Sequence, residues 1–481
     1  MAYDTRTTPA HDAPQQAPPD PRRWSALAVV LVAGFMDLLD STIVNVAVPS
    51  IQRDLKAGYA QVEWMISGYV LAFAAVLITA GRLGDIHGRR RMVLIGLAGF
   101  TLASALSGLS TNPDMLIGAR FLQGGMAGIM VPQLLAIVRT AFPPGERARA
   151  VGLYGAVGGS ATVCGQLLGG LLTQWNLFGL EWRTIFLVNL PVGLAATIAA
   201  WFVLRESRSP APTRLDPWGV VLSITAVFLL IYPLTEGRRL GWPAWIFAML
   251  AGSVLVFAVF LAHQRRLPAR GGVPLVELSL FRSRAFAVGL FAWLLFWLAL
   301  GGFFLAWTLY MQAGLGWSPM HAGFTSAVVA VGAGLGAATS AERLVPRFGR
   351  RVLVAGALIN AAGFGVYAWI AWYYGTAVSS WQMAAPLALS GLGLGLVVAP
   401  VIDLLLGQVP AGVAGSASGL LNTAQQLGMA IGVAVSGVVF FTLLDHRHSS
   451  SSSFALVLGY TAALLLVVGV SFLALPKNTN E

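Results

Sequence analysis

The run FAVGLFAWLLFWLALGGFFLAW, from Phe286 to Trp307, is apolar throughout. A helix of this length crosses the roughly 30 Å hydrocarbon core of a bilayer, because each helical residue rises about 1.5 Å. A strand of a transmembrane barrel would instead alternate apolar and polar side chains over about ten residues. The run therefore predicts a membrane-spanning helix and excludes a barrel.

The composition extends this prediction to the whole chain. Of its 481 residues, 57% are hydrophobic and 10% are charged, and the mean hydropathy is +0.75. A soluble core of this size cannot bury so much apolar surface. Apolar runs of about twenty residues alternate with short polar loops, which predicts an all-α membrane protein of about fourteen transmembrane helices. The expected spans are 25–48, 62–81, 92–110, 115–138, 150–173, 184–204, 216–235, 243–263, 285–311, 320–340, 352–374, 382–402, 416–442 and 454–475.

The basic residues orient these spans. With a cytoplasmic N-terminus, the alternating loops place 23 of the 30 Lys and Arg residues in the cytoplasm and 6 outside. Because cytoplasmic loops carry the excess of positive charge, both termini are expected in the cytoplasm. The net charge of +11 is spread over the loops rather than gathered in one domain. This distribution argues against a nucleic-acid partner.

A basic loop occurs twice along the chain. The pattern R-L-x-x-x-x-G-R-R begins at Arg82 and recurs 261 residues later at Arg343, each time after the second helix of a six-helix half. A chance match of basic loops is the alternative to a true internal repeat, but the matching positions favour two parallel repeats. The expected domains are a disordered cytoplasmic tail (1–22), an N-terminal six-helix bundle (23–205), linkers with two inserted transmembrane helices (206–283), a C-terminal six-helix bundle (284–475) and a cytoplasmic tail (476–481).

Two carboxylates lie deep in the first expected span. Asp37 and Asp40 stand about 13 and 16 residues into it, and their i, i+3 spacing puts them on one helix face. A carboxylate buried in lipid is costly unless it is paired or protonated, so such groups mark proton or substrate pathways. Both residues are candidates for proton coupling or cation binding, and a purely structural pairing with a buried arginine is the alternative.

Arg120 is the other charge within an expected span. It is predicted at a depth close to that of Asp40, which makes an ion pair between the two side chains possible. Gln123 lies one turn further along the same face and would extend the polar path. Such a pair serves either as a structural salt bridge or as a switch that responds when the carboxylate gains a proton.

The first basic loop combines glycine turns, an acid and several arginines. Asp85 at a helix end would find a partner in an arginine or in the N-terminus of another helix, and would thereby latch the cytoplasmic side. A plain positive stop signal is the competing interpretation. The residues assigned to this gating loop are Gly81, Asp85, Gly88, Arg89 and Arg90.

The fifth span is rich in glycine, including Gly165, Gly169 and Gly170. Small residues at such spacings let helices approach closely, and glycine also lets a helix bend. Close packing and bending therefore both remain open for this packing motif.

Amides and one tryptophan are candidates for a substrate cavity. Aromatic walls with a few amides suit a flat, lipophilic ligand, and amides facing lipid would be left unpaired. A lipid-facing position is the alternative for the tryptophan. The candidates are Asn45, Gln123, Gln166, Trp297, Asn422, Gln425 and Gln426.

Several of these stretches together resemble the major facilitator superfamily, and specifically its fourteen-spanner drug:proton antiporter branch. Residues 39–49 (LDSTIVNVAVP) are similar to the first-helix motif of that branch, and residues 81–91 to the superfamily's loop between helices two and three. Residues 120–124 (RFLQG) resemble the fourth-helix motif. Residues 165–170 (GQLLGG) occupy the place of the fifth-helix antiporter motif, but Gln166 replaces its proline.

The resemblance implies the major facilitator fold, with two six-helix bundles rocking around a central cavity. It implies a multidrug or antibiotic efflux transporter of the plasma (inner) membrane that is driven by a proton gradient. Arg120 matches the arginine implicated in proton coupling. No cofactor or metal is expected, and the expected partners are the lipid bilayer, protons and a small hydrophobic or cationic substrate. The chain is expected to work as a monomer.

The sequence leaves three alternatives to an exporter. A proton-coupled importer of a small solute would carry the same motifs, and the missing motif proline leaves the direction of transport open. A membrane-embedded enzyme is disfavoured because the sequence contains no HExxH, GxSxG or P-loop pattern. A passive receptor would not need Asp37, Asp40 and Arg120 inside the membrane.

Overall fold

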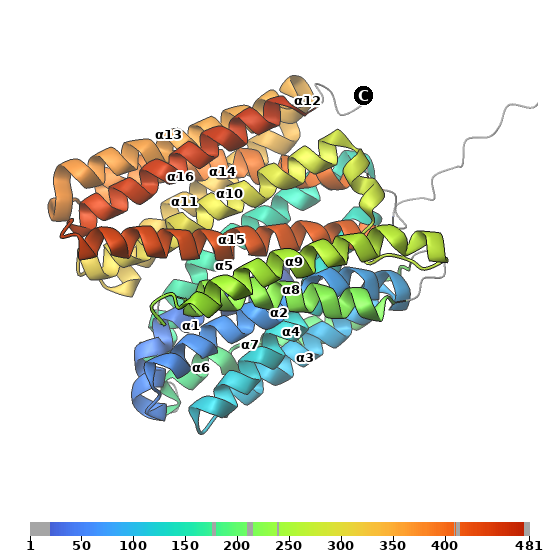
Figure 1. Cartoon of the computed structure of the whole chain (residues 1–481), viewed down its shortest axis with the longest axis horizontal. Coiled ribbons are helices and arrows are strands. Elements are labelled where there is room, and N and C mark those ends of the chain that lie inside the picture. The colour runs from blue at the N-terminus through green and yellow to red at the C-terminus, as the bar shows by residue number, and fades with distance from the viewer. Residues whose placement is uncertain are drawn as a thin grey trace, which may run out of the picture.

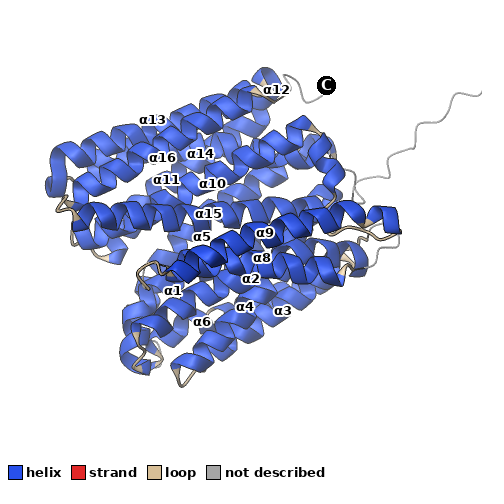
Figure 2. Ribbon diagram, viewed as in Figure 1, coloured by secondary structure: helices blue, strands red, loops and turns tan. Residues whose placement is uncertain are grey.

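The computed structural model describes residues 20–175, 179–208, 215–237, 240–407, 409 and 414–475. This part of the chain forms helices and loops, with no strand among its residues (Figure 2). The predicted tails lie outside it, except for residues 20–22. The helices are α1 (Arg23–Leu55), α2 (Tyr59–His87), α3 (Arg89–Gly108), α4 (Pro113–Ala141), α5 (Pro144–Trp175), α6 (Thr184–Leu187), α7 (Asn189–Val203), α8 (Pro217–Glu236), α9 (Ala244–Arg266), α10 (Arg284–Leu309), α11 (Pro319–Thr339), α12 (Val345–Phe348), α13 (Arg351–Tyr374), α14 (Ser380–Gly407), α15 (Ala414–Asp445) and α16 (Ser450–Leu473).

Each predicted span coincides with a long helix, and the sixth span coincides with α6 and α7 together. Within the described residues, 12 helices are long and apolar enough to cross a membrane, or up to 13 if the bent α2 counts as one span. The 32-residue helix α5 is not among them. The all-α membrane class is confirmed, whereas the count of fourteen spans is not reached.

Local sequence signals explain where several helices begin. Asn112, Asp216 and Ser318 are N-caps whose side chains accept hydrogen bonds from the backbone N–H three residues ahead. Each is followed by proline at the first helical position, where the missing N–H costs nothing. These short polar-proline sequences therefore fix the starts of α4, α8 and α11.

The same pattern of helix neighbours occurs in the two halves of the chain (Figure 1). In the first half, α1 packs on α5 and α7, α2 on α4, and α3 on α4 and α7. In the second half, α10 packs on α15 and α16, α11 on α14, and α13 on α14 and α16. The counterparts of α1, α2, α3, α4, α5 and α7 are thus α10, α11, α13, α14, α15 and α16. The packing accords with the repeat suggested by the duplicated basic loop.

The contacts between the halves follow the same correspondence. Helix α5 packs on α11, and α2 packs on α15. Because α15 is the counterpart of α5 and α11 is the counterpart of α2, the two contacts are equivalent. Helices α8 and α9 pack on each other, and α8 also touches α2 and α15. The inserted pair therefore lies beside the contact between α2 and α15 (Figure 1).

Glycines bring α2 onto α4 and α11 onto α14 at backbone distance. A β-carbon added to Gly124 of α4 would overlap the carbonyl oxygen of Tyr69 in α2. One added to Gly391 of α14 would overlap the carbonyl oxygen of Val329 in α11. Because backbone atoms cannot yield as a flexible side chain does, these two pairs are rigid units.

The glycines of α5 behave differently from one another. A β-carbon at Gly165 would overlap the hydroxyl oxygen of Thr42 and lie 2.9 Å from the carbonyl oxygen of Leu39, both in α1. At Gly170 it would meet no atom within 4 Å. Close packing therefore explains Gly165, whereas at Gly170 the added β-carbon would find open space although the residue is buried. Gly169 is buried, and its carbonyl oxygen accepts a hydrogen bond from Thr173.

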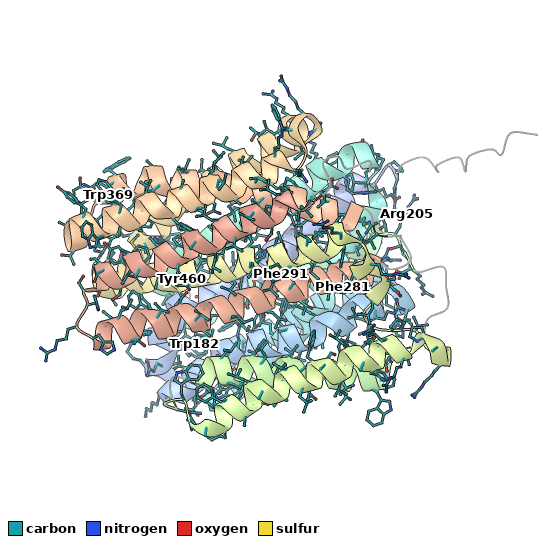
Figure 3. The ribbon with its side chains drawn as sticks, turned by 45° about the horizontal axis from the view of Figure 1, so that its top comes forward. Trp182, Arg205, Phe281, Phe291, Trp369 and Tyr460 are labelled. Atoms are coloured by element: carbon teal, nitrogen blue, oxygen red, sulfur yellow. The ribbon has the colours of Figure 1, made fainter. Side chains whose placement is uncertain are left out.

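Large apolar side chains cover the outside of the helices, as a protein surrounded by lipid requires. Trp369 of α13 and Phe291 of α10 are 57% and 56% exposed, and Trp369 lies at the margin of the molecule in Figure 3. A soluble protein would rarely leave so many such side chains in water. The surface thus agrees with a multi-pass membrane protein.

Hydrogen bonds join the end of α1 to the turn before α6. The carboxylate of Asp54 accepts hydrogen bonds from Trp182 Nε1 at 2.9 Å and from Arg183 Nη1 at 2.6 Å. These hydrogen bonds, first from Trp182 and then from Arg183, lower the pKa of Asp54. The ionised carboxylate therefore holds this loop against α1.

The contrast between Gly165 and Gly170 gives a matched pair of substitutions. We expect Gly165→Ala to destabilise the purified protein by about 1–3 kcal/mol, because overpacking outweighs the better helix propensity of alanine. We expect Gly170→Ala to be neutral or slightly stabilising. Thermal unfolding in detergent measures both, and equal melting temperatures for the two variants would contradict the close contact between α1 and α5.

Candidate functional site

Helix α1 carries Asp37 and Asp40 into the interior of the first half. Their side chains face the same way because they are separated by three residues. Asp37 is 6% exposed and Asp40 is fully buried. A charged group at such a position needs partners, and the neighbouring helices supply them.

Asp40 is held by a cation and two amides. Its Oδ2 lies 2.5 Å from Nη1 of Arg120. Its Oδ1 accepts hydrogen bonds from Gln123 Nε2 and Asn189 Nδ2, both at 2.9 Å. Helices α4 and α7 thereby surround this carboxylate on the inner face of α1. The ion pair between Asp40 and Arg120, which the sequence made possible, is present in the structure. Gln123 belongs to the same network.

Arg120 reaches several groups besides Asp40. Its Nη1 also donates to Gln123 Oε1 at 2.7 Å, and its Nε donates to the Met65 carbonyl oxygen at 3.2 Å. The guanidinium carbon lies 4.4 Å from the centre of the Tyr69 ring. A planar guanidinium with five donors can hold these partners together, which a lysine ammonium cannot do.

Tyr69 links the two carboxylates. Its hydroxyl donates to Asp37 Oδ1 at 2.5 Å, while its ring lies against Arg120. Among the described residues, no basic side chain forms an ion pair with Asp37. The site therefore contains one carboxylate paired with an arginine and one held by a neutral phenol, which is an arrangement that can take up and release a proton.

Asn189 and Tyr69 were not predicted from the sequence. Asn189 also donates to Ser104 Oγ at 3.1 Å, and Ser104 donates to the Phe186 carbonyl oxygen at 2.9 Å. Asn189 is a lone amide near the start of an apolar span, so the argument applied to the amides of span thirteen would have found it. Tyr69 gave no such signal because aromatic residues are common in apolar runs.

Among the described residues, the predicted cavity residues of α10 and α15 do not join this network. Asn422 donates to the Ser418 carbonyl oxygen of its own helix at 2.9 Å. Gln425 and Gln426 of α15 and Trp297 of α10 are half-buried. The indole N–H of Trp297 is buried without a hydrogen-bond partner among the described residues. The side chains of Asn45 and Gln166 lie outside the part that the structure describes.

The predicted gating loop lies where α2 meets α15. Asp85 Oδ1 accepts a hydrogen bond from Arg89 at 3.0 Å, and Oδ2 lies 3.9 Å from Arg82. The backbone N–H of Ser416, in the first turn of α15, interacts favourably with the Asp85 carboxylate. Asp85 thus lies between an arginine and the N-terminus of α15.

Further close contacts join α15 to the first half. A β-carbon on Gly419 of α15 would lie 3.5 Å from Cα of Gly81 in α2. The hydroxyl of Ser418 donates to the Pro132 carbonyl oxygen of α4 at 3.0 Å. Helix α15 is therefore held to both α2 and α4 near its N-terminus.

Gly88 turns the chain sharply between α2 and α3. Its φ of 102° lies in the region that favours glycine. The carboxylate of Glu206 accepts hydrogen bonds from the backbone N–H groups of Arg90 at 3.2 Å and Arg91 at 3.3 Å. Glu206 thus caps α3 at its positive end, a role that sequence reasoning did not assign to it. Arg90 Nη2 donates to the Trp201 carbonyl oxygen at 2.6 Å.

The described residues contain no group of three or more His, Cys, Asp or Glu side chains that could hold a metal ion.

Known proteins resemble this chain along most of its length. The family model of the Major Facilitator Superfamily matches residues 30–433. A probable actinorhodin transporter of Streptomyces coelicolor is 41% identical over 434 residues, covering 90% of this chain and 75% of that protein. The tetracenomycin C resistance and export protein of Streptomyces glaucescens is 36% identical over 455 residues, covering 90% of this chain and 80% of that protein.

Solved structures show the same fold. The human organic anion transporter MFSD10 (TETRAN) matches with a TM-score of 0.67 at 17% identity, over 94% of this chain and 100% of that chain. The proton:xylose symporter XylE matches with a TM-score of 0.64 at 15% identity, over 93% and 94%.

The hydrogen bond from Asn189 to Asp40 can be tested by stability. We expect Asn189→Ala to lower the free energy of unfolding by about 1–3 kcal/mol, because a buried carboxylate oxygen loses one of its donors. Asn422→Ala is the matched control, since that amide bonds only a neutral carbonyl of its own helix, and a smaller loss is expected. Thermal unfolding in detergent separates the two, and an equal loss in both variants would count against the network.

Proposed function

The chain belongs to the Major Facilitator Superfamily, and from this premise we propose that it exports small hydrophobic or cationic compounds, such as antibiotics, in exchange for protons. It is a membrane transporter of the drug-efflux kind, not an enzyme. The observation that carries the proposal is the buried pair of Asp40 and Arg120, completed by Gln123 and Asn189. The names of its relatives support export of natural products, since they describe transporters of actinorhodin and tetracenomycin C.

Proton coupling is assigned to the ion pair. A proton arriving from outside neutralises Asp40, so the carboxylate no longer holds Arg120 as strongly. Arg120 keeps Gln123, the Met65 carbonyl oxygen and the Tyr69 ring as partners. Protonation thus changes the contacts of α1 with α4 without leaving the guanidinium bare. Asp37, bonded to Tyr69, is the second candidate proton acceptor.

Transport proceeds by alternating access between two bundles, which we assign to residues 23–205 and 284–475, with 206–283 as the inserted segment. The equivalent contacts of α2 with α15 and of α5 with α11 support this division. In the outward-facing state the substrate leaves as Asp40 gains a proton. After reorientation, Asp40 loses the proton to the cytoplasm and the restored charge favours binding of the next substrate.

The substrate cavity is assigned to Gln123, Trp297 and the amides of α15, namely Asn422, Gln425 and Gln426, together with Asn45 and Gln166. The half-buried state of Trp297, Gln425 and Gln426 leaves them accessible to a ligand. Flat aromatic antibiotics would stack on the indole and hydrogen-bond with the amides. We place the protein in the plasma (inner) membrane with both termini in the cytoplasm, and propose that it acts as a monomer.

The cytoplasmic gate is assigned to Asp85 and its partners. The carboxylate of Asp85 interacts favourably with the backbone N–H of Ser416 in α15 and accepts a hydrogen bond from the guanidinium of Arg89. An anion at a helix N-terminus is stabilised by the helix dipole, so this contact favours the state in which the cytoplasmic ends of α2 and α15 are closed.

Coupling predicts the behaviour of an Asp40→Asn variant. Asparagine keeps the shape of the aspartate side chain but cannot exchange a proton. We therefore expect the variant to fold but to lose proton-driven efflux. The measurement is proton flux in reconstituted vesicles challenged with a panel of aromatic antibiotics. Retained pH-driven efflux in Asp40→Asn would refute the coupling role.

The gate predicts a change in conformation for Asp85→Asn. Spin labels on His87→Cys and Arg351→Cys, at exposed positions on α2 and α13, report the separation of the halves once Cys164 is replaced by serine. We expect Asp85→Asn to add a population with a longer distance, because the helix-dipole contact is weakened. Asp20→Asn, outside the gate, serves as control, and identical distance distributions in all three proteins would exclude a latch at Asp85.

A further inference from the structure

Helix α9 is the most exposed of the candidate spans. Only 17% of its apolar window is buried. Val254 and Leu255 are 71% and 67% exposed. In a membrane protein such a face contacts the acyl chains of lipids. Lipids are therefore the immediate neighbours of this helix along its length.

Basic residues gather where α9 ends. Arg265 and Arg266 occupy its last turn, and Arg270 ends the short 3-10 helix Pro268–Arg270 that follows. Gly271, with φ of 72°, then reverses the chain. Among the described residues, no carboxylate forms an ion pair with these three arginines. Their charge is available to a ligand on the cytoplasmic side.

A hollow of about 290 Å³ opens beside this turn. Its wall is apolar toward the membrane and basic toward the cytoplasm. The residues that line it are Val259, Ala262, His263, Arg266, Leu267 and Arg270. A ligand that fits must therefore carry negative charge at one end and hydrocarbon at the other.

The back of the hollow is fixed by hydrogen bonds. His263 Nε2 lies 2.9 Å from Asp216 Oδ2, and Gln264 Nε2 donates to the same oxygen at 2.8 Å. Gln264 Oε1 accepts from the backbone N–H of Leu275 at 2.6 Å. These contacts tie the end of α9 to the start of α8 and to the following linker. The hollow is thus a preformed feature rather than a loose chain end.

We propose that this hollow binds the phosphate headgroup of an anionic phospholipid from the cytoplasmic leaflet. Arg266 and Arg270 bind the phosphate oxygens, since guanidinium groups form paired, charge-assisted hydrogen bonds with phosphate. One acyl chain follows Val259 and Ala262 along the exposed face of α9. A headgroup with net negative charge is favoured over a zwitterionic one because the site offers cations and no free carboxylate among the described residues.

The proposal is tested by lipid binding to the full-length protein in detergent, measured by native mass spectrometry. The probes are phosphatidylglycerol and phosphatidylcholine with identical acyl chains, and soluble glycerol phosphate. The wild type is expected to bind phosphatidylglycerol about fivefold or more tightly than phosphatidylcholine. Arg266→Gln with Arg270→Gln should remove this preference. Because both arginines are exposed, the variant is expected to fold, which its melting temperature checks.

Arg282→Gln with Arg284→Gln is the matched control. It removes two exposed arginines from the same side of the protein, outside the hollow, and should keep the preference within about twofold. An equal loss of the preference for phosphatidylglycerol in both double variants would show general charge attraction. That result would overturn the proposed binding site. Binding of glycerol phosphate as tight as that of the lipid would overturn the assignment to a membrane lipid. Neither outcome depends on whether the chain exports antibiotics.

Discussion

The ion pair between Asp40 and Arg120 is the constraint on which the first half of the molecule depends. A fully buried carboxylate is tolerated only because one guanidinium and two amides, from α4 and α7, neutralise and bond it. Loss of Arg120 would leave the carboxylate of Asp40 uncompensated, so the ion pair holds α1 and α4 in register. Under the proposed function, the same contact would also respond to a proton, because protonated Asp40 would hold Arg120 less strongly.

The second constraint is the way in which the halves meet. Near its N-terminus, helix α15 donates a hydrogen bond from Ser418 to α4, and its backbone N–H at Ser416 interacts favourably with Asp85 of α2. Ser416 also donates from its hydroxyl to the Leu275 carbonyl oxygen at 2.7 Å, and Leu275 is bonded to Gln264 of α9. The inserted helices are thus attached to the turn of α15 that faces Asp85 of α2. A lipid bound at the end of α9 would lie at one end of this chain of hydrogen bonds.

Much of the fold was predictable because bilayer thickness gives each span a length that can be recognised in the sequence. Charges inside those spans identified Asp37, Asp40 and Arg120, since a buried charge is conspicuous among apolar residues. Tyr69 was not predictable, because its role depends on which helix lies opposite Asp37. Spacing alone did not separate Gly165, which touches α1, from Gly170, where an added β-carbon would meet no atom within 4 Å. Glu206 was missed because it acts on α3 from a distant linker.

The contact of Gly124 with the Tyr69 carbonyl oxygen has a mechanical consequence. It joins α2 and α4 beside Gln123 and Arg120, while the far end of α2 carries Asp85. Helix α2 bends by 52° between Leu77 and Thr79, so it is not one straight rod. The close contact fixes the segment with Tyr69 to α4, whereas the segment with Asp85 lies beyond the bend. A change of angle at the bend would move Asp85 relative to α15 while Tyr69 kept its place beside Asp37. The proposed gate and the proposed proton site then belong to two segments of one helix that can move separately.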